Sequence, residues 1–203
     1  MAKRIIKLVV PILGVVPLVA CGPTTGDAQL TGGSSTTSGT ETSAREVPSG
    51  VPRVAKPLDV TKYTQNPCSV LTSTQLRAFN VQSAGEPGKN TDPYCRWSDS
   101  SGPSNMSFTV TIATSRDGLA AVYRNRENFT TVFEQFDAEG YPGVLLGGKE
   151  VSLGMCDSEV GVSDKLSFSV TVRLSQRSPD SANPCRQVKA LATEIVKTMK
   201  GQG

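Results

Sequence analysis

The sequence predicts an α+β domain in which a single antiparallel sheet is packed by N- and C-terminal helices and held by two disulfides. Residues 166–174 alternate between apolar and polar side chains, which is typical of an antiparallel strand with one buried face. A run with apolar residues at helical spacing closes the chain after Asn183. Four of the five cysteines lie between residues 68 and 185. An even number of cysteines in an exported domain favours disulfides.

The first 20 residues have the three parts of a secretory signal peptide. Basic residues precede an apolar run over residues 8–19 that is too short to span a bilayer as a helix. The run ends in Leu18-Val19-Ala20-Cys21, which resembles the lipobox at which bacteria acylate a cysteine and cleave the chain before it. We therefore expect lipid on Cys21 and a location on the extracytoplasmic face of the cell membrane. An ordinary signal peptide that ends near a cysteine is the alternative.

Residues 21–62 are predicted to form a disordered tether between the lipid and the folded domain. From Gly22 to Val60, 22 of 39 residues are Gly, Ser, Thr or Pro, and the first aromatic residue of the chain is Tyr63. Such a composition buries too little apolar surface to offset the entropy lost on ordering. The folded domain is therefore expected over residues 63–203, a length that supports one core.

The excess positive charge of the chain lies in its leader. The first 20 residues hold three of the 21 Lys and Arg residues and none of the 18 Asp and Glu residues, so the cleaved chain is formally neutral. The whole-chain pI of about 8.6 therefore gives no argument for nucleic acid as a partner. The expected partners are the membrane, through the lipid on Cys21, and an envelope protein or small ligand of unknown identity.

Cys68, Cys95, Cys156 and Cys185 remain as an even number once Cys21 is assigned to the lipid. In an exported protein this favours two disulfides. Their separations of 27, 61 and 29 residues include no C-x-x-C pair and no metal-knuckle spacing. Of the three possible connectivities we favour Cys68 with Cys95 and Cys156 with Cys185, because each closes a short loop. A bond between Cys68 and Cys185 would instead join the two ends of the domain.

The first half of the domain is predicted to hold a helix, a loop and a strand. Thr72 and Gln75 form a capping-box pattern that begins a short helix, with Leu76 and Phe79 buried. Residues 85–93 contain glycine and proline and are predicted to be a loop. Residues 107–113 alternate between polar and apolar side chains, which predicts a strand.

The next segment is predicted to be a helix over residues 117–128. Residues 129–136 fit helical spacing but contain strand-prone residues, so both structures stay open, with a break favoured near Asn128. Residues 140–143 and 147–148 are predicted to be turns.

The end of the chain is predicted to be a strand pair followed by a helix. Residues 156–162 should pair with residues 166–174 through a short connection. The last helix has Asn183 as its cap and Pro184 in its first turn, and it should pack on the sheet. Its apolar positions are Val188, Leu191, Ala192, Ile195 and Met199.

Several distinctive short segments follow one another along the domain, over about residues 65–199. They are Asn66-Pro67-Cys68, Leu71-Thr72, Cys95-Arg96-Trp97, Gly140-Tyr141-Pro142, Cys156 and Asn183-Pro184-Cys185. With these segments the domain resembles an actinobacterial family of secreted lipoproteins of unknown function, which includes LprB-type and LprC-type lipoproteins. The resemblance implies a cell-envelope location and no established activity, so no catalytic residue can be carried over.

Common catalytic motifs are absent from the sequence. The chain has no histidine, which excludes Ser-His-Asp and Cys-His catalysis, and it has no G-x-S-x-G or S-x-x-K segment. Gly147-Gly148 precedes a strand-like run, so it is not a phosphate-binding loop that opens a helix. We therefore expect no catalytic residue, no metal ion and no cofactor.

Two groups of carboxylates are the remaining candidates for chemistry. Glu134, Asp137 and Glu139 form one group, and Asp157 and Glu159 form the other. Either group could supply a general acid and base or bind calcium, although no EF-hand spacing occurs. Solvated surface charge is the alternative that we favour.

Trp97 and Tyr141 are the candidate ligand-binding residues. Trp97, close to Cys95, could line a groove, although a place in the core is the favoured alternative. Tyr141 lies between Gly140 and Pro142, where a tight turn explains it as well as a ligand contact does.

Three functions follow as hypotheses. The first is a non-enzymatic, lipid-anchored extracytoplasmic domain that binds a partner or small ligand in the cell envelope. The second is an envelope enzyme that uses carboxylates, acting on glycan. The third is a thiol oxidoreductase, which requires a free reactive thiol.

Overall fold

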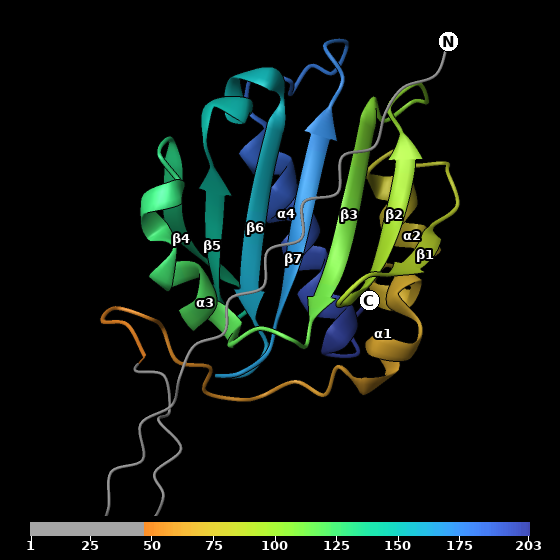
Figure 1. The fold of residues 1–203 in the computed structure, drawn as a ribbon. Coiled ribbons are helices and arrows are strands. Elements are labelled where there is room, and N and C mark those ends of the chain that lie inside the picture. The colour runs from red at the N-terminus through yellow and green to blue at the C-terminus, as the bar shows by residue number, and fades with distance from the viewer. Residues whose placement is uncertain (1–46) are drawn as a thin grey trace, which may run out of the picture. The chain divides into compact units, whose positions relative to one another are not determined.

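The structure, a computed structural model, describes residues 47–203. The predicted signal peptide, Cys21 and most of the predicted tether lie outside the described residues. Residues 47–203 form a seven-stranded antiparallel sheet with helices against both faces (Figure 1). The predicted α+β class with one antiparallel sheet is therefore confirmed.

The sheet consists of two meanders joined in the middle. The strands lie in the order β1-β2-β3-β7-β6-β5-β4, so β3 pairs with β7 across a large gap in sequence. Their bounds are β1 Glu86–Lys89, β2 Pro93–Asp99, β3 Met106–Ala113, β4 Val132–Ala138, β5 Tyr141–Gly147, β6 Met155–Gly161 and β7 Ser167–Leu174.

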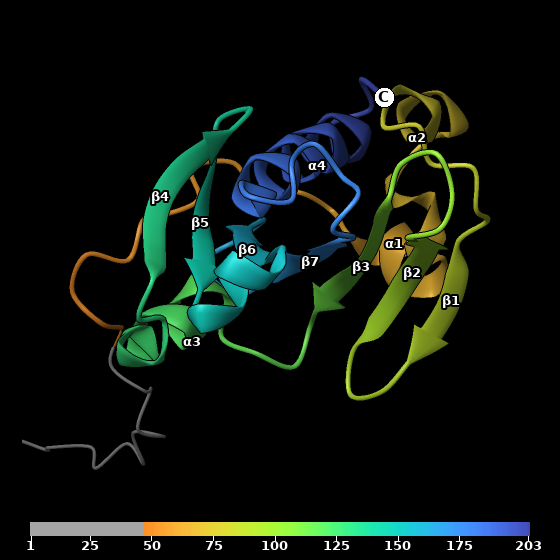
Figure 2. The same ribbon diagram turned by 90° about the horizontal axis from the view of Figure 1, so that it is seen from above.

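The helices divide unequally between the two faces of the sheet. The long C-terminal helix α4 packs on one face with α1 and α2, and α3 lies on the other face beside β5 and β6 (Figure 2). The α-helices are α1 Thr61–Gln65, α2 Ser73–Ala78, α3 Gly118–Arg124 and α4 Pro184–Met199. Short 3-10 turns cover Pro67–Val70, Arg126–Asn128 and Lys149–Leu153.

The main core lies between the sheet and α4. Every second residue of β7 is buried there, as the alternation predicts, and α4 contributes the apolar stripe seen in the sequence. These residues are Phe168, Val170, Val172 and Leu174 from β7 and Val188, Leu191, Ala192 and Ile195 from α4. A smaller cluster joins Leu119, Val122 and Tyr123 of α3 to Val144 and Leu146 of β5.

The two predicted disulfides are present in the favoured pairing. Cys68 bonds Cys95 and ties the first 3-10 turn to β2, and Cys156 bonds Cys185 and ties β6 to the first turn of α4. In a domain of this size each bond contributes about 3 kcal/mol by restricting the unfolded chain.

Two segments form strands where the sequence predicted turns or a loop. Residues 86–89, predicted as loop, form the edge strand β1, in which Pro87 pairs with Cys95. An edge strand uses only one side of its backbone for pairing, so it tolerates proline. Residues 141–147 form β5, because the turn is confined to Glu139 and Gly140, both of which have positive φ.

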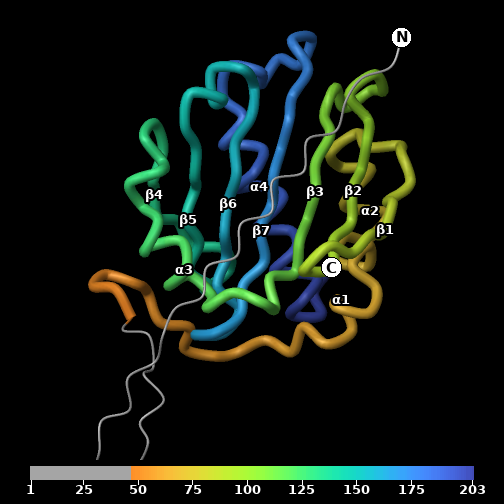
Figure 3. The backbone as a smooth tube through the Cα atoms, viewed as in Figure 1, coloured from red at the N-terminus to blue at the C-terminus, as the bar shows by residue number. Residues whose placement is uncertain are grey.

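The last part of the predicted tether packs against the domain. Residues 47–60 run along one end of the sheet toward α1 (Figure 3). Val54 and Val60 are buried in the core, and the Leu58 N–H donates a hydrogen bond of 2.9 Å to the Val162 carbonyl. The packed chain therefore begins before Tyr63.

Candidate functional site

The side of β2, β3, β7 and β6 that faces away from α4 carries mostly polar side chains. We call this surface the open face, because among the described residues the helix α3 covers only its β5 side. The side chains that form it alternate with the core residues of the same strands. The open face is therefore the surface that the fold leaves available for a ligand.

The strand register arranges the open face into rows that run across four strands. Paired residues of neighbouring strands point to the same side of a sheet, so each row is a set of neighbouring side chains. The first row is Ser98, Ser107, Arg173 and Met155. The second row is Arg96, Thr109, Thr171 and Asp157, and the third is Tyr94, Thr111, Ser169 and Glu159.

The first two rows surround an open depression of about 390 Å³. Arg96 and Arg173 line it from β2 and β7, and both side chains are exposed. The other residues that line it are Ser98, Ser107, Phe108, Thr109, Met155 and Thr171. The lining thus combines two cations with four hydroxyl groups.

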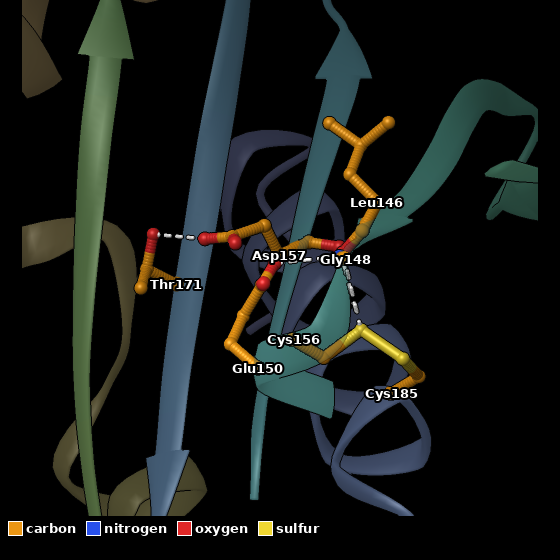
Figure 4. Close-up of a disulfide and its surroundings, with 7 residues drawn as sticks. All are labelled: Leu146, Gly148, Glu150, Cys156, Asp157, Thr171 and Cys185. Atoms are coloured by element: carbon orange, nitrogen blue, oxygen red, sulfur yellow. Dashed lines mark hydrogen bonds between the residues drawn. A yellow bond between two sulfur atoms is a disulfide. The ribbon is translucent and has the colours of Figure 1, made fainter. Parts of the chain in front are cut away.

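Asp157 lies next to this depression and is held by Thr171. The Thr171 hydroxyl donates a hydrogen bond to the Asp157 carboxylate (Figure 4). The neighbouring Cys156 points to the opposite face of the sheet, where it bonds Cys185. Burial raises the pKa of Asp157, the Thr171 hydrogen bond opposes that rise, and the nearby charge of Glu150 adds to it. Asp157 therefore holds its proton to higher pH than an exposed aspartate.

Glu159 is the most deeply buried carboxylate of the open face, with 2% of its surface exposed. The Ser167 hydroxyl donates to it, and the Arg116 guanidinium lies 3.9 Å from its carboxylate. Burial raises the pKa of Glu159, and the hydrogen bond and the cation only partly offset this. Asp92 lies on the other side of Arg116, also at 3.9 Å.

Asp92 shows the opposite behaviour. Burial alone would raise its pKa, but hydrogen bonds from the backbone and hydroxyl groups of Ser115 and Thr114 outweigh burial and lower it. The pKa values of these carboxylates therefore shift in opposite directions, because Asp92 is less desolvated and accepts more hydrogen bonds than Asp157 and Glu159 do.

The first carboxylate group predicted from the sequence is not assembled into a site. Glu134 and Asp137 are exposed on the edge strand β4, and Glu139 lies in the following turn near Lys197 and Lys200 of α4. The second group, Asp157 and Glu159, does share one side of β6. No cluster of His, Cys, Asp and Glu residues that could hold a metal ion occurs within residues 47–203.

Neither predicted ligand-binding aromatic lies on the open face. Trp97 is 1% exposed and stacks on Phe108 with ring centroids 4.7 Å apart, which is the core position given as its alternative. Tyr141 is buried in the core at the start of β5. All four domain cysteines are paired, so residues 47–203 contain no free thiol for the oxidoreductase hypothesis.

Arg96 and Arg173 were not singled out in the sequence. Each occupies a polar position of an alternating strand, which by itself indicates only a solvated side chain. Their neighbourhood depends on the pairing of β2 with β3 and of β3 with β7. No local pattern in the chain encodes the second of these pairings.

Comparison with known proteins gives one match. The model of the family described as "Protein of unknown function (DUF3558)" matches residues 16–198, which is most of the chain. No curated protein and no solved structure matches the chain significantly. Among residues 47–203 no helix is both long and apolar enough to cross a bilayer. The chain belongs to the DUF3558 family of proteins of unknown function.

Proposed function

We propose that this protein is a lipid-anchored, extracytoplasmic binding domain that holds a polar small ligand or partner of the cell envelope on its open face, without catalysis. The observation that carries the proposal is the depression beside Arg96 and Arg173. Residues from four strands, β2, β3, β6 and β7, line this one depression, which concentrates polar and charged groups at a single place on the open face.

The proposed location rests on the cysteines. Two disulfides indicate that the domain folds in an oxidising, extracytoplasmic compartment. The family match begins at residue 16, ahead of Cys21, so the lipobox-like segment lies inside the matched region. Lipid on Cys21 would then keep the domain at the membrane surface.

The binding surface is tested by a substitution that fills the depression with a large side chain. Thr109 lies at its centre on β3 and Thr74 lies exposed on α2, so Thr109→Trp and Thr74→Trp make the same chemical change at two places. The full chain and both variants are immobilised and exposed to envelope extract. We expect a component that is captured by the native chain and by Thr74→Trp to be lost with Thr109→Trp. Unchanged capture by Thr109→Trp would contradict the proposal.

A carboxylate-dependent envelope enzyme is the second candidate, and one observation favours it. Asp157 and Glu159 share one side of β6, and the pKa of each is raised, mainly by burial, as a general acid requires. Turnover of envelope glycan that disappears in Asp157→Asn or Glu159→Gln would support it. The matched controls are Glu134→Gln and Asp137→Asn, which change exposed carboxylates away from the open face. Turnover that no amide substitution alters would exclude this candidate.

A further inference from the structure

We infer that the depression between Arg96 and Arg173 binds a phosphate group carried by an organic ligand. This inference rests on the proposed function, because it names the chemistry of a ligand for the same face. It depends on three features of the site: two cations without anionic partners, hydroxyl groups without hydrogen-bond partners, and space beyond that of a bare ion.

The two arginines have no carboxylate partner. Among the described residues, ion pairs within 4 Å involve Arg53, Arg116, Arg124 and Arg186, but neither Arg96 nor Arg173. Neither guanidinium donates a hydrogen bond to another described side chain or carbonyl group. Each therefore keeps its full set of donors for a ligand.

The spacing of the two arginines suits one shared anion. They lie on strands separated by β3 and in neighbouring rows, which places their Cα atoms about 12 Å apart by ordinary strand spacings. An arginine side chain spans about half that distance, so both guanidinium groups can reach an anion between them. One guanidinium can satisfy both oxygens of a planar carboxylate, whereas the oxygens of a phosphate group point in tetrahedral directions, so that two guanidinium groups can contact it from different sides.

Hydroxyl groups supply further donors between the arginines. Ser98, Ser107 and Thr109 line the depression, and none of their hydroxyls has a hydrogen-bond partner among residues 47–203. Thr171 differs, because its proton is donated to Asp157. The site therefore offers two guanidinium groups and three free hydroxyls to the oxygens of one ligand.

Asp157 is the nearest negative charge and does not block this use. It pairs with Thr171 and is a diagonal neighbour of Arg173, but among residues 47–203 no ion pair within 4 Å joins it to either arginine. Its raised pKa, caused mainly by burial, weakens its repulsion of an anion as the pH falls.

The size of the depression indicates that the phosphate carries an organic group. About 390 Å³ is several times the volume of a phosphate ion, and the Met155 side chain adds apolar lining. The same chemistry is offered by a phosphorylated solute and by the head group of a phospholipid. The experiment separates these two sources.

The test uses the full chain and three kinds of probe. The probes are inorganic phosphate, glycerophosphoglycerol as a head group without acyl chains, and vesicles of phosphatidylglycerol compared with phosphatidylcholine. Amide shifts in NMR spectra report the soluble probes, and co-sedimentation reports the vesicles. The variants are Arg96→Gln and Arg173→Gln, with Arg77→Gln on α2 as the matched exposed control.

We expect shifts confined to β2, β3 and β7, and binding that weakens about tenfold or more in Arg96→Gln and in Arg173→Gln but not in Arg77→Gln. Binding of phosphatidylglycerol vesicles alone, with the same dependence on the two arginines, would identify a lipid head group as the source. The inference is overturned if no probe binds, or if Arg77→Gln weakens binding as much, since net charge would then explain the effect. Thermal unfolding of each variant shows that its fold is intact.

Failure of this inference can be told from failure of the proposed function. If Thr109→Trp abolishes capture of an envelope component while the arginine variants keep it, the open face binds a ligand without phosphate. If none of these variants alters capture, the open face is not the binding surface.

Discussion

At the scale of single residues, the buried Glu159 makes the stability of the domain depend on pH. A buried carboxylate that is hydrogen-bonded by one hydroxyl and faces one cation at 3.9 Å is not fully compensated for its lost hydration. Its raised pKa means that the folded state keeps a proton that the unfolded state has already lost.

The first prediction concerns this proton. Above the ordinary glutamate pKa of 4.5, unfolding releases the proton, so the free energy of unfolding should fall as the pH rises through the raised pKa. One proton limits that slope to about 1.4 kcal/mol per pH unit. Glu159→Gln, which is neutral throughout, should flatten the profile above pH 4.5 in urea unfolding experiments.

Asp99 provides the internal control for that prediction. Burial alone would raise its pKa, but hydrogen bonds from Ser104 and from backbone N–H groups outweigh burial and lower it, so its stabilising contribution is present above 3.8 and is lost as the pH falls below that value. Asp99→Asn should therefore change only the acid end of the profile. An unaltered slope above pH 4.5 in Glu159→Gln would show that Glu159 does not hold the released proton.

At the scale of secondary-structure elements, the short helix α2 is built into the domain through Gln75. The capping box predicted from Thr72 and Gln75 is present, with both reciprocal hydrogen bonds. The Gln75 amide also donates to the Glu194 carbonyl at 2.9 Å, and the Thr198 hydroxyl donates to Gln75 at 2.9 Å. One buried side chain thus caps α2 and joins it to α4.

The second prediction separates these two roles. Thr72→Ala removes only the cap and should cost about 1 kcal/mol of unfolding free energy. Gln75→Ala also removes the hydrogen bonds to the Glu194 carbonyl and from the Thr198 hydroxyl on α4, and it should cost more, about 2–3 kcal/mol. Thr74→Ala, exposed on the same helix, should change stability by less than about 0.5 kcal/mol in the same chemical denaturation. Equal costs for Thr72→Ala and Gln75→Ala would mean that the link to α4 contributes nothing.

Sequence patterns predicted the elements whose signals are local. The alternation of β3 and β7, the cap of α2 and the apolar stripe of α4 are all confirmed. β5 was missed because its positions on both faces are buried, which removes the alternation, and because glycine and proline occur within it. β1 was missed because an edge strand is stabilised by its partner rather than by its own residues.

Only part of the candidate site could be predicted from the sequence. The sequence grouped Asp157 with Glu159 but favoured solvated surface charge for both, which is wrong for Glu159, because the sheet buries it, and for the half-buried Asp157. The arginines come from strands that are 77 residues apart in sequence, counting from Arg96 to Arg173, and meet only through β3. Trp97 and Tyr141, prominent in the sequence, are needed by the core.

At the scale of the whole molecule, the stability of the domain depends on a segment whose composition is that of a linker. Residues 47–60 contain proline and few large side chains, yet Val54 and Val60 are buried and the Val54 N–H donates to the Asp164 carboxylate at 3.0 Å. Val54 lies 3.1 Å from where a side chain on Gly161 would begin, so the glycine makes room for it.

The third prediction follows from this packing. A chain that begins at Tyr63 should unfold at a lower temperature and lower urea concentration than one that begins at Val47. Each buried valine contributes about 1.5–3 kcal/mol, so the loss should be several kcal/mol. Arg53→Ala in the longer chain, which removes only an exposed ion pair, should have little effect and serves as the control. Identical unfolding of the two chains would contradict the prediction.

The pairing of β3 with β7 has a consequence for how the protein matures. Cys68 and Cys95 both precede this junction, and Cys156 and Cys185 both lie in the second meander or after it, so neither bond crosses the junction. When a chain emerges from a translocon with its N-terminus first, the bond between Cys68 and Cys95 can close before Cys156 appears. Oxidation in order of emergence then yields the native pairs directly, and the protein has little need of disulfide isomerisation.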